Sequence, residues 1–381
     1  MKKKHKTKQK IADVCERTLE YLMRSQDFTA GEYYGSFWSE KAYHGPLLNY
    51  HAGGSHHNRT AGSAGLAMWL VGLERNDRNL QDRAEAAFDW AAARQRPSGG
   101  YYEIQNNEKP SDWELTGLEE CSTIELAAVI HGLGNALLKG LPPKKMYGDC
   151  LQKAGHWLLS IEMPAGSGIF PHHERSPYDC LNANMFASES LALIYTVMSQ
   201  IYGRNINIFL EGYLRALRHT LELQWPNGCF PYRANQGSTI NYSVAVAWCI
   251  LNIVDIFPEN LRHGYLPTSE IDNAIRKVSA FLYGCIDSRG RFLWDKYETS
   301  SAKHNLAPSV LALNVLVRIG GRQNMKAVGR LWNFLLTRVT GSGLLPMRDH
   351  GEEITECAMM QADILMNLLG ISLKASMLTK K

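Results

Sequence analysis

The feature that most constrains this chain is a helix pair that recurs six times along its 381 residues. Each unit begins with an amphipathic segment whose apolar residues recur at i, i+3, i+4 and i+7, as on the buried face of a helix. The segment ends in a glycine-bearing turn, with an aromatic or apolar residue two positions later. The six glycines are Gly31, Gly100, Gly168, Gly228, Gly290 and Gly343, and the residues after them are Tyr33, Tyr102, Phe170, Phe230, Phe292 and Leu345. A repeat of this length predicts an array of helical hairpins.

The second half of each unit is a helix with few charges and many Ala, Ser and Leu residues. Examples are AGSAGLAMWLVGL at 61–73 and FASESLALIYTV at 186–197. A helix that is apolar on nearly all sides is buried, so these helices are expected to lie inside the charged first set. Strand signals are weak throughout. The sequence therefore predicts an all-α fold, an (α/α)6 toroid of six outer and inner helices.

The alternative to a closed ring is an open α-solenoid, which also stacks helix pairs. The end repeats of an open array are usually more polar than the middle ones, because one of their faces meets solvent. Here both end units are as apolar as the others. This observation favours closure.

The repeats place a single toroid domain at residues 11–375, preceded by a basic leader at residues 1–10. The leader holds six lysines, and without them the formal net charge of +4 becomes −2 (4 − 6). A nearly neutral body offers no basic face for duplex DNA, so no nucleic-acid partner is expected. The leader is expected to be flexible and solvated, and contact with anionic lipid or RNA is the less favoured interpretation. The sequence does not indicate the oligomeric state of the protein.

No stretch is apolar enough for an integral membrane segment, which needs about 20 such residues. No apolar region follows the lysines, as it would in a secretory signal. The eight cysteines are scattered singly and lie mostly in apolar helical contexts such as Ala247-Trp248-Cys249-Ile250. This usage is typical of reduced, buried thiols and favours a cytoplasmic protein. No motif implies a metal ion or another cofactor.

Two of the glycine turns resemble those of known toroidal enzymes. They run from Gln95 through Gly99 to Tyr102 and from Gln224 through Gly228 to Phe230. Both are similar to the Gln-x-x-x-Gly-x-aromatic turns of squalene-cyclase-type and prenyltransferase-type toroids, and to turns in toroidal polysaccharide lyases and related carbohydrate-active enzymes. The resemblance extends over the whole repeat system, but it concerns architecture, and a fold does not name a function.

The motifs of the lipid and zinc members of this superfamily are absent from the sequence. Class II terpene cyclases use an Asp-x-Asp-Asp motif, and lanthipeptide-cyclase-like toroids use a Cys-His-Gly zinc motif; neither occurs here. Protein prenyltransferases bind zinc through Asp, Cys and His, but no Cys and His lie at a tight ligand spacing. Carbohydrate-active toroids are the class of toroidal enzyme that remains after these exclusions. A terpenoid- or prenyl-handling enzyme and a non-catalytic interaction module stay as alternatives.

The loops from each outer helix to the following inner helix are expected to meet at one mouth of the ring. They carry aromatic, amide, imidazole and guanidinium groups, which stack on sugar rings and hydrogen-bond their hydroxyls. We predict the following substrate-binding residues in these loops: Trp38, Tyr50, His51, Glu103, Trp113, His172, His173, Arg233, Asn241, Trp294, Asp295, His304, Arg348 and Glu356.

The sharpest cluster is His56-His57-Asn58-Arg59, at the expected start of an inner helix. Proton removal beside a uronate carboxylate requires that the carboxylate be neutralised, which Asn and Arg do by hydrogen bonding. It also requires a base, which His supplies, and an acid for the leaving oxygen. The predicted acid is a tyrosine: Tyr102, Tyr232 or Tyr242. Toroidal uronate lyases resemble this mixture, although a helix cap by Ser55 or Asn58 would also explain the cluster.

His172 and His173 are not expected to bind one metal ion together, because adjacent residues of an extended segment point to opposite sides.

Several other histidines and tryptophans are expected to be structural. Helical His131 and His219 are expected to have structural partners. The tryptophans assigned to the core are Trp69, Trp157, Trp248 and Trp332.

The sequence thus predicts an enzyme acting on an acidic, uronate-containing glycan or oligosaccharide, by β-elimination. A glycoside hydrolase, which needs two carboxylates, remains an alternative because the loops contain many acids. A uronyl epimerase, which uses the same base and carboxylate clamp, is also left open.

Overall fold

The computed structural model describes residues 2–40, 42–44, 49–51, 55–102, 120–176, 178–234, 240–257, 262, 264–293, 306–347 and 355–378. Its outer helices are α1 (Lys2–Ser25), α3 (Arg78–Ala93), α5 (Lys145–Ser160), α7 (Asn207–Glu222), α10 (Thr268–Gly284) and α12 (Arg322–Leu336). Its inner helices are α2 (Asn58–Arg75), α4 (Thr123–Leu138), α6 (Leu181–Gln200), α8 (Ile240–Ile256), α11 (Leu306–Ile319) and α13 (Ala358–Leu378). Residues 2–10, expected as a flexible leader, are the first turns of α1.

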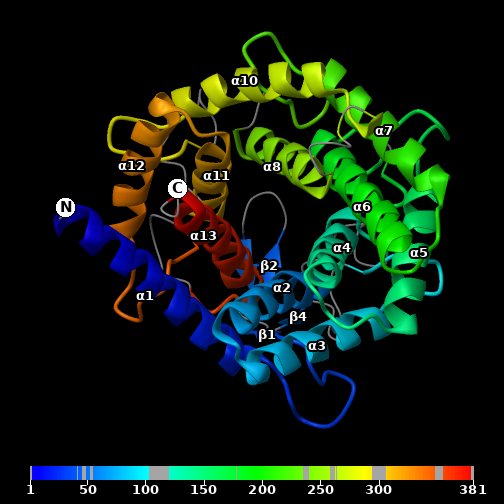
Figure 1. Ribbon diagram of the computed structural model, residues 1–381, viewed down its shortest axis with the longest axis horizontal. Helices are drawn as coiled ribbons and strands as arrows, with labels where there is room; N and C mark the ends of the chain where they lie inside the picture. Colours follow the sequence, from blue (N-terminus) through cyan, green and yellow to red (C-terminus); the bar gives the residue numbers. More distant parts are fainter. Residues whose placement is uncertain are drawn as a thin grey trace.

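The helices form two concentric rings (Figure 1). Consecutive inner helices pack against each other from α2 through α4, α6, α8 and α11 to α13, and α13 packs against α2. The last inner helix thus meets the first, which confirms the predicted (α/α)6 toroid and excludes the open solenoid. The close approach depends on small residues: a Cβ on Gly132 of α4 would lie 2.1 Å from the carbonyl oxygen of Gly62 on α2.

Each outer helix ends in a turn whose glycine lies against the next outer helix. Five of these glycines have positive φ and approach backbone atoms: Gly35 on α3, Gly99 on α5, Gly168 on α7, Gly228 on α10 and Gly290 on α12. In the sixth turn, Gly343 lies against the side chain of Arg17 on α1. Gly35 and Gly99 hold this position in the first two units, which corrects the alignment on Gly31 and Gly100.

Glutamines fix three of these turns to the following outer helix. Gln95 donates from Nε2 to the carbonyl of Gly99 (2.9 Å) and to that of Cys150 on α5 (2.8 Å). Gln26 and Gln224 make the same pair of bonds in their own repeats. Because one side chain satisfies two carbonyls, each of these three glutamines joins consecutive outer helices.

In four of the inner helices, α4, α6, α11 and α13, the first backbone amide donates a hydrogen bond to the loop of the next repeat. The pairs are Thr123 N to His172 O (2.9 Å), Leu181 N to Tyr232 O (3.0 Å), Leu306 N to Met347 O (3.1 Å) and Ala358 N to Ser39 Oγ (3.1 Å). The first amides of a helix have no partner inside it, so these bonds satisfy them and position the loops. The last pair crosses from the sixth repeat to the first.

Short strands occur in the loop that joins α1 to α2. Strand β1 (Trp38–Ser39) pairs antiparallel with β4 (Ser55–His56), and β2 (Ala42–His44) pairs with β3 (Asn49–His51). The eight cysteines are buried and form no disulfide bonds, in agreement with the expected reduced thiols. Among the helices described, none has the length and apolar character needed to cross a membrane.

Candidate active site at the mouth of the ring

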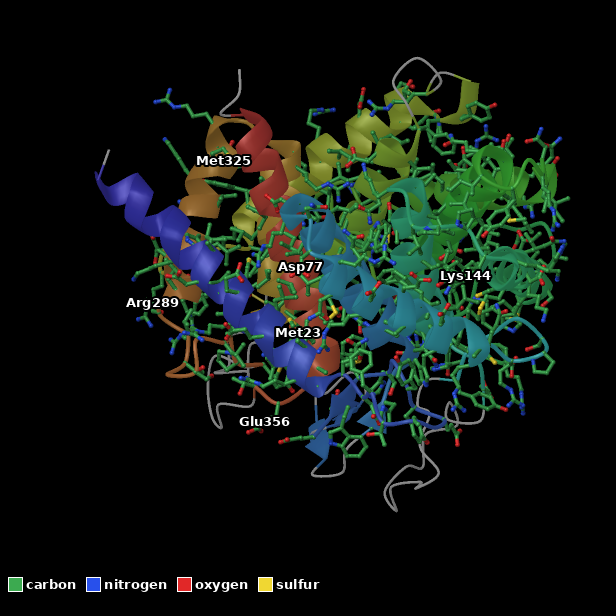
Figure 2. All side chains as sticks on the ribbon, turned by 60° about the horizontal axis from the view of Figure 1, so that its bottom comes forward. Met23, Asp77, Lys144, Arg289, Met325 and Glu356 are labelled. Carbon is green, nitrogen blue, oxygen red and sulfur yellow. The ribbon has the colours of Figure 1, made fainter. Side chains whose placement is uncertain are left out.

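The loops that run from outer to inner helices lie at one end of the ring, which we call the mouth. Figure 2 shows the strands of the first loop and Glu356 of the sixth loop at this end. The first loop covers residues 26–57, the third 161–180 and the fourth 223–239. Because the inner helices start here, their N-termini all point to the mouth, and the positive ends of their dipoles favour an anionic ligand.

His56 is enclosed by aromatic and polar groups of its own loop. Its Nδ1 hydrogen-bonds Ser36 Oγ (2.7 Å), and its ring stacks on Tyr33 with centroids 4.1 Å apart. The indole of Trp38, which is 43% exposed, lies 5.1 Å away. The residue itself is only 5% exposed, and burial lowers the pKa of its imidazole to about 4. His56 is therefore neutral at physiological pH.

The next three residues are built into the start of α2. His57 is the N-cap residue, is 2% exposed, and its Nε2 hydrogen-bonds Ser55 Oγ (2.8 Å). Asn58 donates from Nδ2 to the carbonyl of Tyr102 (3.3 Å), while its buried Oδ1 has no hydrogen-bond partner in the described part of the chain. Neither Ser55 nor Asn58 caps the helix through its side chain, because no such bond is present at the cap.

Arg59 is held by the last inner helix. Its guanidinium forms an ion pair with Asp363 of α13, which also accepts a hydrogen bond from Ser63 (3.0 Å). Its backbone amide donates to the buried carboxylate of Glu125 on α4 (3.0 Å). These bonds tie α2 to both neighbours, α13 and α4. The guanidinium is thus already neutralised by a carboxylate of the protein.

Tyr102 lies beside the start of α2, in the second turn. Its backbone pairs with Cys121, and the guanidinium of Arg96 lies 4.5 Å from the centroid of its ring. Among the predicted acids it is the one that contacts the His56–Arg59 segment, through Asn58.

His172 and His173 lie side by side, contrary to the expectation that they point apart. Their Nδ1 atoms are 3.1 Å apart and their ring centroids 4.3 Å apart. The segment is not a regular strand: the carbonyl of His172 caps α4, while His173 pairs with Ser122. Because a hydrogen bond between two ring nitrogens needs one acceptor, at least one imidazole is neutral when that bond is present.

Tyr232 and Arg233 of the fourth loop lie in an aromatic cluster with Tyr178 of the third loop and Tyr242 of α8. The rings of Tyr232 and Tyr242 stack with centroids 4.2 Å apart. The Cζ of Arg233 lies 3.6 Å from the ring centroid of Tyr178 and 5.5 Å from that of Tyr232. The Nε of Arg233 is buried and has no hydrogen-bond partner within the described residues. Backbone pairing with Cys180 holds Arg233 beside the start of α6.

Burial raises the pKa of both stacked tyrosines. The pKa of Tyr242 rises to about 12, and that of Tyr232 rises further; the nearby Cys180 adds to both shifts. Both phenols are therefore protonated at neutral pH, the state in which a phenol donates a proton or a hydrogen bond.

Many predicted binding residues cannot be placed in the site. Side chains that lie outside the described residues are Tyr50, His51, Glu103, Trp113, Asn241, Trp294, Asp295, His304 and Arg348. Glu356 is half-buried beside the start of α13. Within the described ranges, no three His, Cys, Asp or Glu side chains are grouped so that they could hold a metal ion.

One residue that matters here was not predicted. Asp363 supplies the carboxylate that binds Arg59. It carries a sequence signal, since it is the one acidic residue of inner helix α13. Tyr178, which supplies the ring nearest to Arg233, was expected among the aromatic residues of the third loop.

No protein-family model matches the chain, and a search of curated proteins finds no relative. Solved structures do match over nearly their whole length. A D-mannose isomerase superposes with a TM-score of 0.69 at 14% identity, covering 96% of this chain and 97% of the other. The cellobiose 2-epimerase from Spirochaeta thermophila gives 0.67 at 11% identity, covering 98% of each chain. An unsaturated glucuronyl hydrolase specific for heparin gives 0.65 at 10% identity, covering 97% and 98%. At such low identity the likeness shows the fold alone: the chain is an (α/α)6 toroid of the kind found in these proteins.

Proposed function

We propose that the protein is a carbohydrate-active enzyme whose substrate binds at the mouth, between the third and fourth loops. The structural neighbours support this proposal, because the three described above are named for reactions on sugars. The composition of the two loops also supports it. Tyrosine rings, imidazoles and a guanidinium provide the stacking surfaces and directional hydrogen bonds that a sugar with an anionic group requires.

The substrate in this proposal is an acidic, uronate-containing glycan, and the observation that carries it is the state of Arg233. Its guanidinium is oriented by Tyr178 and Tyr232, and its buried Nε has no protein acceptor in the described part of the chain. The Nη groups of a planar guanidinium can form two parallel N–H bonds with a carboxylate while the Nε stays buried. Arg59 is less suited to binding the substrate carboxylate, because its guanidinium is already paired with Asp363.

The reaction in this proposal is β-elimination. A neutral imidazole of the His172–His173 pair removes the proton on the carbon next to the carboxylate, whose charge Arg233 neutralises. The electron pair of that C–H bond forms the new C=C bond as the glycosidic oxygen leaves. The departing oxygen takes a proton from Tyr232 or Tyr242, whose raised pKa values keep both phenols protonated.

Contacts on neighbouring inner helices support this division of roles. The third loop caps α4 through His172, and the fourth loop caps α6 through Tyr232. Helices α4 and α6 pack against each other, so the imidazole pair and the tyrosine stack belong to adjacent sectors of the mouth. The predicted roles of His57, Asn58 and Tyr102 in the same reaction stay predictions.

Epimerisation is a second candidate, because one structural neighbour is named a cellobiose 2-epimerase. An epimerase takes the proton from one face of the carbon and returns a proton to the other face. The same carboxylate clamp would serve this reaction. Hydrolysis, which needs two carboxylates, is less well supported because two described acids near this site, Glu120 and Glu125, already bind Arg175 and the Arg59 amide.

The test is an absorbance assay for unsaturated uronate, run on a panel of polyuronates and uronate oligomers, with reducing ends measured in parallel. β-Elimination predicts that the chromophore and the reducing ends appear together. Reducing ends without the chromophore would establish hydrolysis instead. If neither signal appears, the reaction is repeated in D2O, where deuterium in the recovered glycan would identify an epimerase. No change in any of the three measurements would contradict the proposal.

A further inference from the structure

A second group of polar side chains lies deeper in the ring, away from the loops. His131 of α4, Glu189 of α6 and Trp248 of α8 are each eight residues beyond the first residue of their helix. At 1.5 Å per residue, this places them about 12 Å below the mouth, at one level of the ring. They therefore occupy equivalent positions in three consecutive repeats.

Contacts among these residues show that they face the central axis. The rings of His131 and Trp248 have centroids 4.7 Å apart, although α6 lies between their helices in the inner ring. The carboxylate of Glu189 accepts from His131 Nδ1 (2.6 Å) and from Asn252 Nδ2 of α8 (3.0 Å). Side chains of α4 and α8 can meet in this way only on the axial side of α6.

Solvent reaches this level of the ring. The side chain of His131 is 16% exposed and Trp248 is half-buried, whereas Glu189 is 4% exposed. Groups that face the axis and still have exposed surface border water on the axial side of the ring. Trp248 was expected in the core, and His131 was expected to be structural; the axial position gives both an accessible face.

The hydrogen bonds determine which acceptors and charges the accessible face presents to a ligand. Glu189 receives the Nδ1–H of His131, so the neutral imidazole presents Nε2 as an acceptor. Beyond Asn252, the nearly buried guanidinium of Arg318 is paired with Asp255 (3.0 Å). Arg318 also interacts electrostatically with Glu189, so Glu189, Asp255 and Arg318 together carry a net charge of −1 when His131 is neutral. A negative charge in this position disfavours a carboxylate and suits an uncharged ligand with hydroxyl donors.

We propose that His131, Glu189, Asn252 and Trp248 form an axial subsite that binds an uncharged sugar ring. Trp248 stacks on the C–H face of the ring, and His131 Nε2 accepts a hydrogen bond from one of its hydroxyls. The inference rests on the proposed function, since it assigns the uronate to Arg233 at the mouth and an uncharged residue of the same glycan to the axis.

The test is calorimetric titration of the full chain with cellobiose, an uncharged disaccharide, and with digalacturonate, an acidic one. Trp248→Leu is expected to weaken cellobiose binding at least tenfold, and His131→Gln several-fold, while Trp248→Phe, which keeps a ring, retains most of it. Digalacturonate affinity is expected to change less than threefold in each variant. His219→Asn is the matched control, because His219 also pairs with a carboxylate, Asp179 (2.8 Å), but lies on outer helix α7.

The outcomes separate this inference from the proposed function. Cellobiose binding that depends on Trp248 supports the axial subsite even if no polyuronate is turned over. Unchanged cellobiose affinity in Trp248→Leu, or no binding by the unmodified protein, overturns the subsite and leaves the mouth proposal standing. An equal loss in His219→Asn would also overturn it, because the effect would then be one of stability.

Discussion

The first loop and the third and fourth loops of this toroid contain similar residue types in very different states. In the first loop His56 is stacked and buried, and just after it, in α2, Arg59 is bound by Asp363. In the third and fourth loops two imidazoles touch each other, and Arg233 lies against tyrosine rings with a buried Nε that no described group accepts. The comparison teaches that the same residue types can differ in burial and in partners from one loop to another.

The difference arises from the place of each loop in the ring. The first repeat meets the last, and Arg59, Ser63 and Ser39 supply side chains to that junction with α13. Polar groups used for closure must be paired, because an unpaired buried polar group is costly. The loops around α6 lie inside the array, where backbone bonds from neighbouring repeats already fix the position of Arg233.

Replacing Arg233 or Arg59 separately by alanine gives the largest expected difference between the two regions. Arg233→Ala is expected to lower kcat/KM on a polyuronate about 1,000-fold, since loss of one partner from a desolvated charge pair costs about 2–5 kcal/mol. Arg59→Ala is expected to keep activity within tenfold but to lower the melting temperature, because Asp363 loses its partner. Arg233→Lys keeps the charge without the planar fork and should recover little activity. The opposite pattern would assign the carboxylate to the first loop.

The histidines provide the next largest contrast. Replacing His172 and His173 together by glutamine is expected to lower kcat about 100-fold, the usual loss when a general base is removed. His57→Gln should change kcat only a few-fold, because its imidazole is 2% exposed and bonded to Ser55. Steady-state rates of both variants decide the question, and a larger loss in His57→Gln would restore the first loop as the source of the base.

The glycine turn of the first loop tests how much a close backbone approach contributes to stability. Gly35→Ala is expected to lower the free energy of unfolding by about 3 kcal/mol, because a Cβ there would lie 2.3 Å from the Ala86 carbonyl oxygen in addition to the left-handed backbone. Gly140→Ala is the matched control: its φ of +89° is close to the +91° of Gly35, but nothing lies within 4 Å. It should cost about 1 kcal/mol. Equal costs by urea unfolding would show that the close approach does not matter.

The pH dependence of stability gives the smallest expected effect. Since the pKa of His56 falls from 6.5 to about 4 on folding, the unfolded chain binds more protons at this site between those values. Stability from His56 is therefore complete above pH 6.5 and is lost as pH falls, by about 2 kcal/mol between pH 7 and pH 5. Unfolding titrations of His56→Gln should show a shallower loss over this range. Identical slopes would mean that His56 is not buried as the first loop requires.

The repeat pattern predicted most of the fold, and residue types predicted part of the site. The alternation of amphipathic and apolar helices was sufficient for the ring, because helix periodicity and charge distribution report directly which faces are buried. The assignment of Gly31 and Gly100 was wrong, because the glycine that matters is defined by contact with the next helix. The separation expected for His172 and His173 was also wrong, because that segment is not a regular strand.

The sequence by itself determined that the chain forms six outer and inner helical hairpins, and which loop ends carry chemistry-bearing residues. Only the tertiary structure decided that Asp363 pairs with Arg59 and that His131 meets Trp248 across the axis. The physical reason is the distance along the chain over which each effect acts. Helix formation and burial depend on neighbours three or four residues away, whereas pairing of charges and rings depends on partners that only closure of the ring brings together.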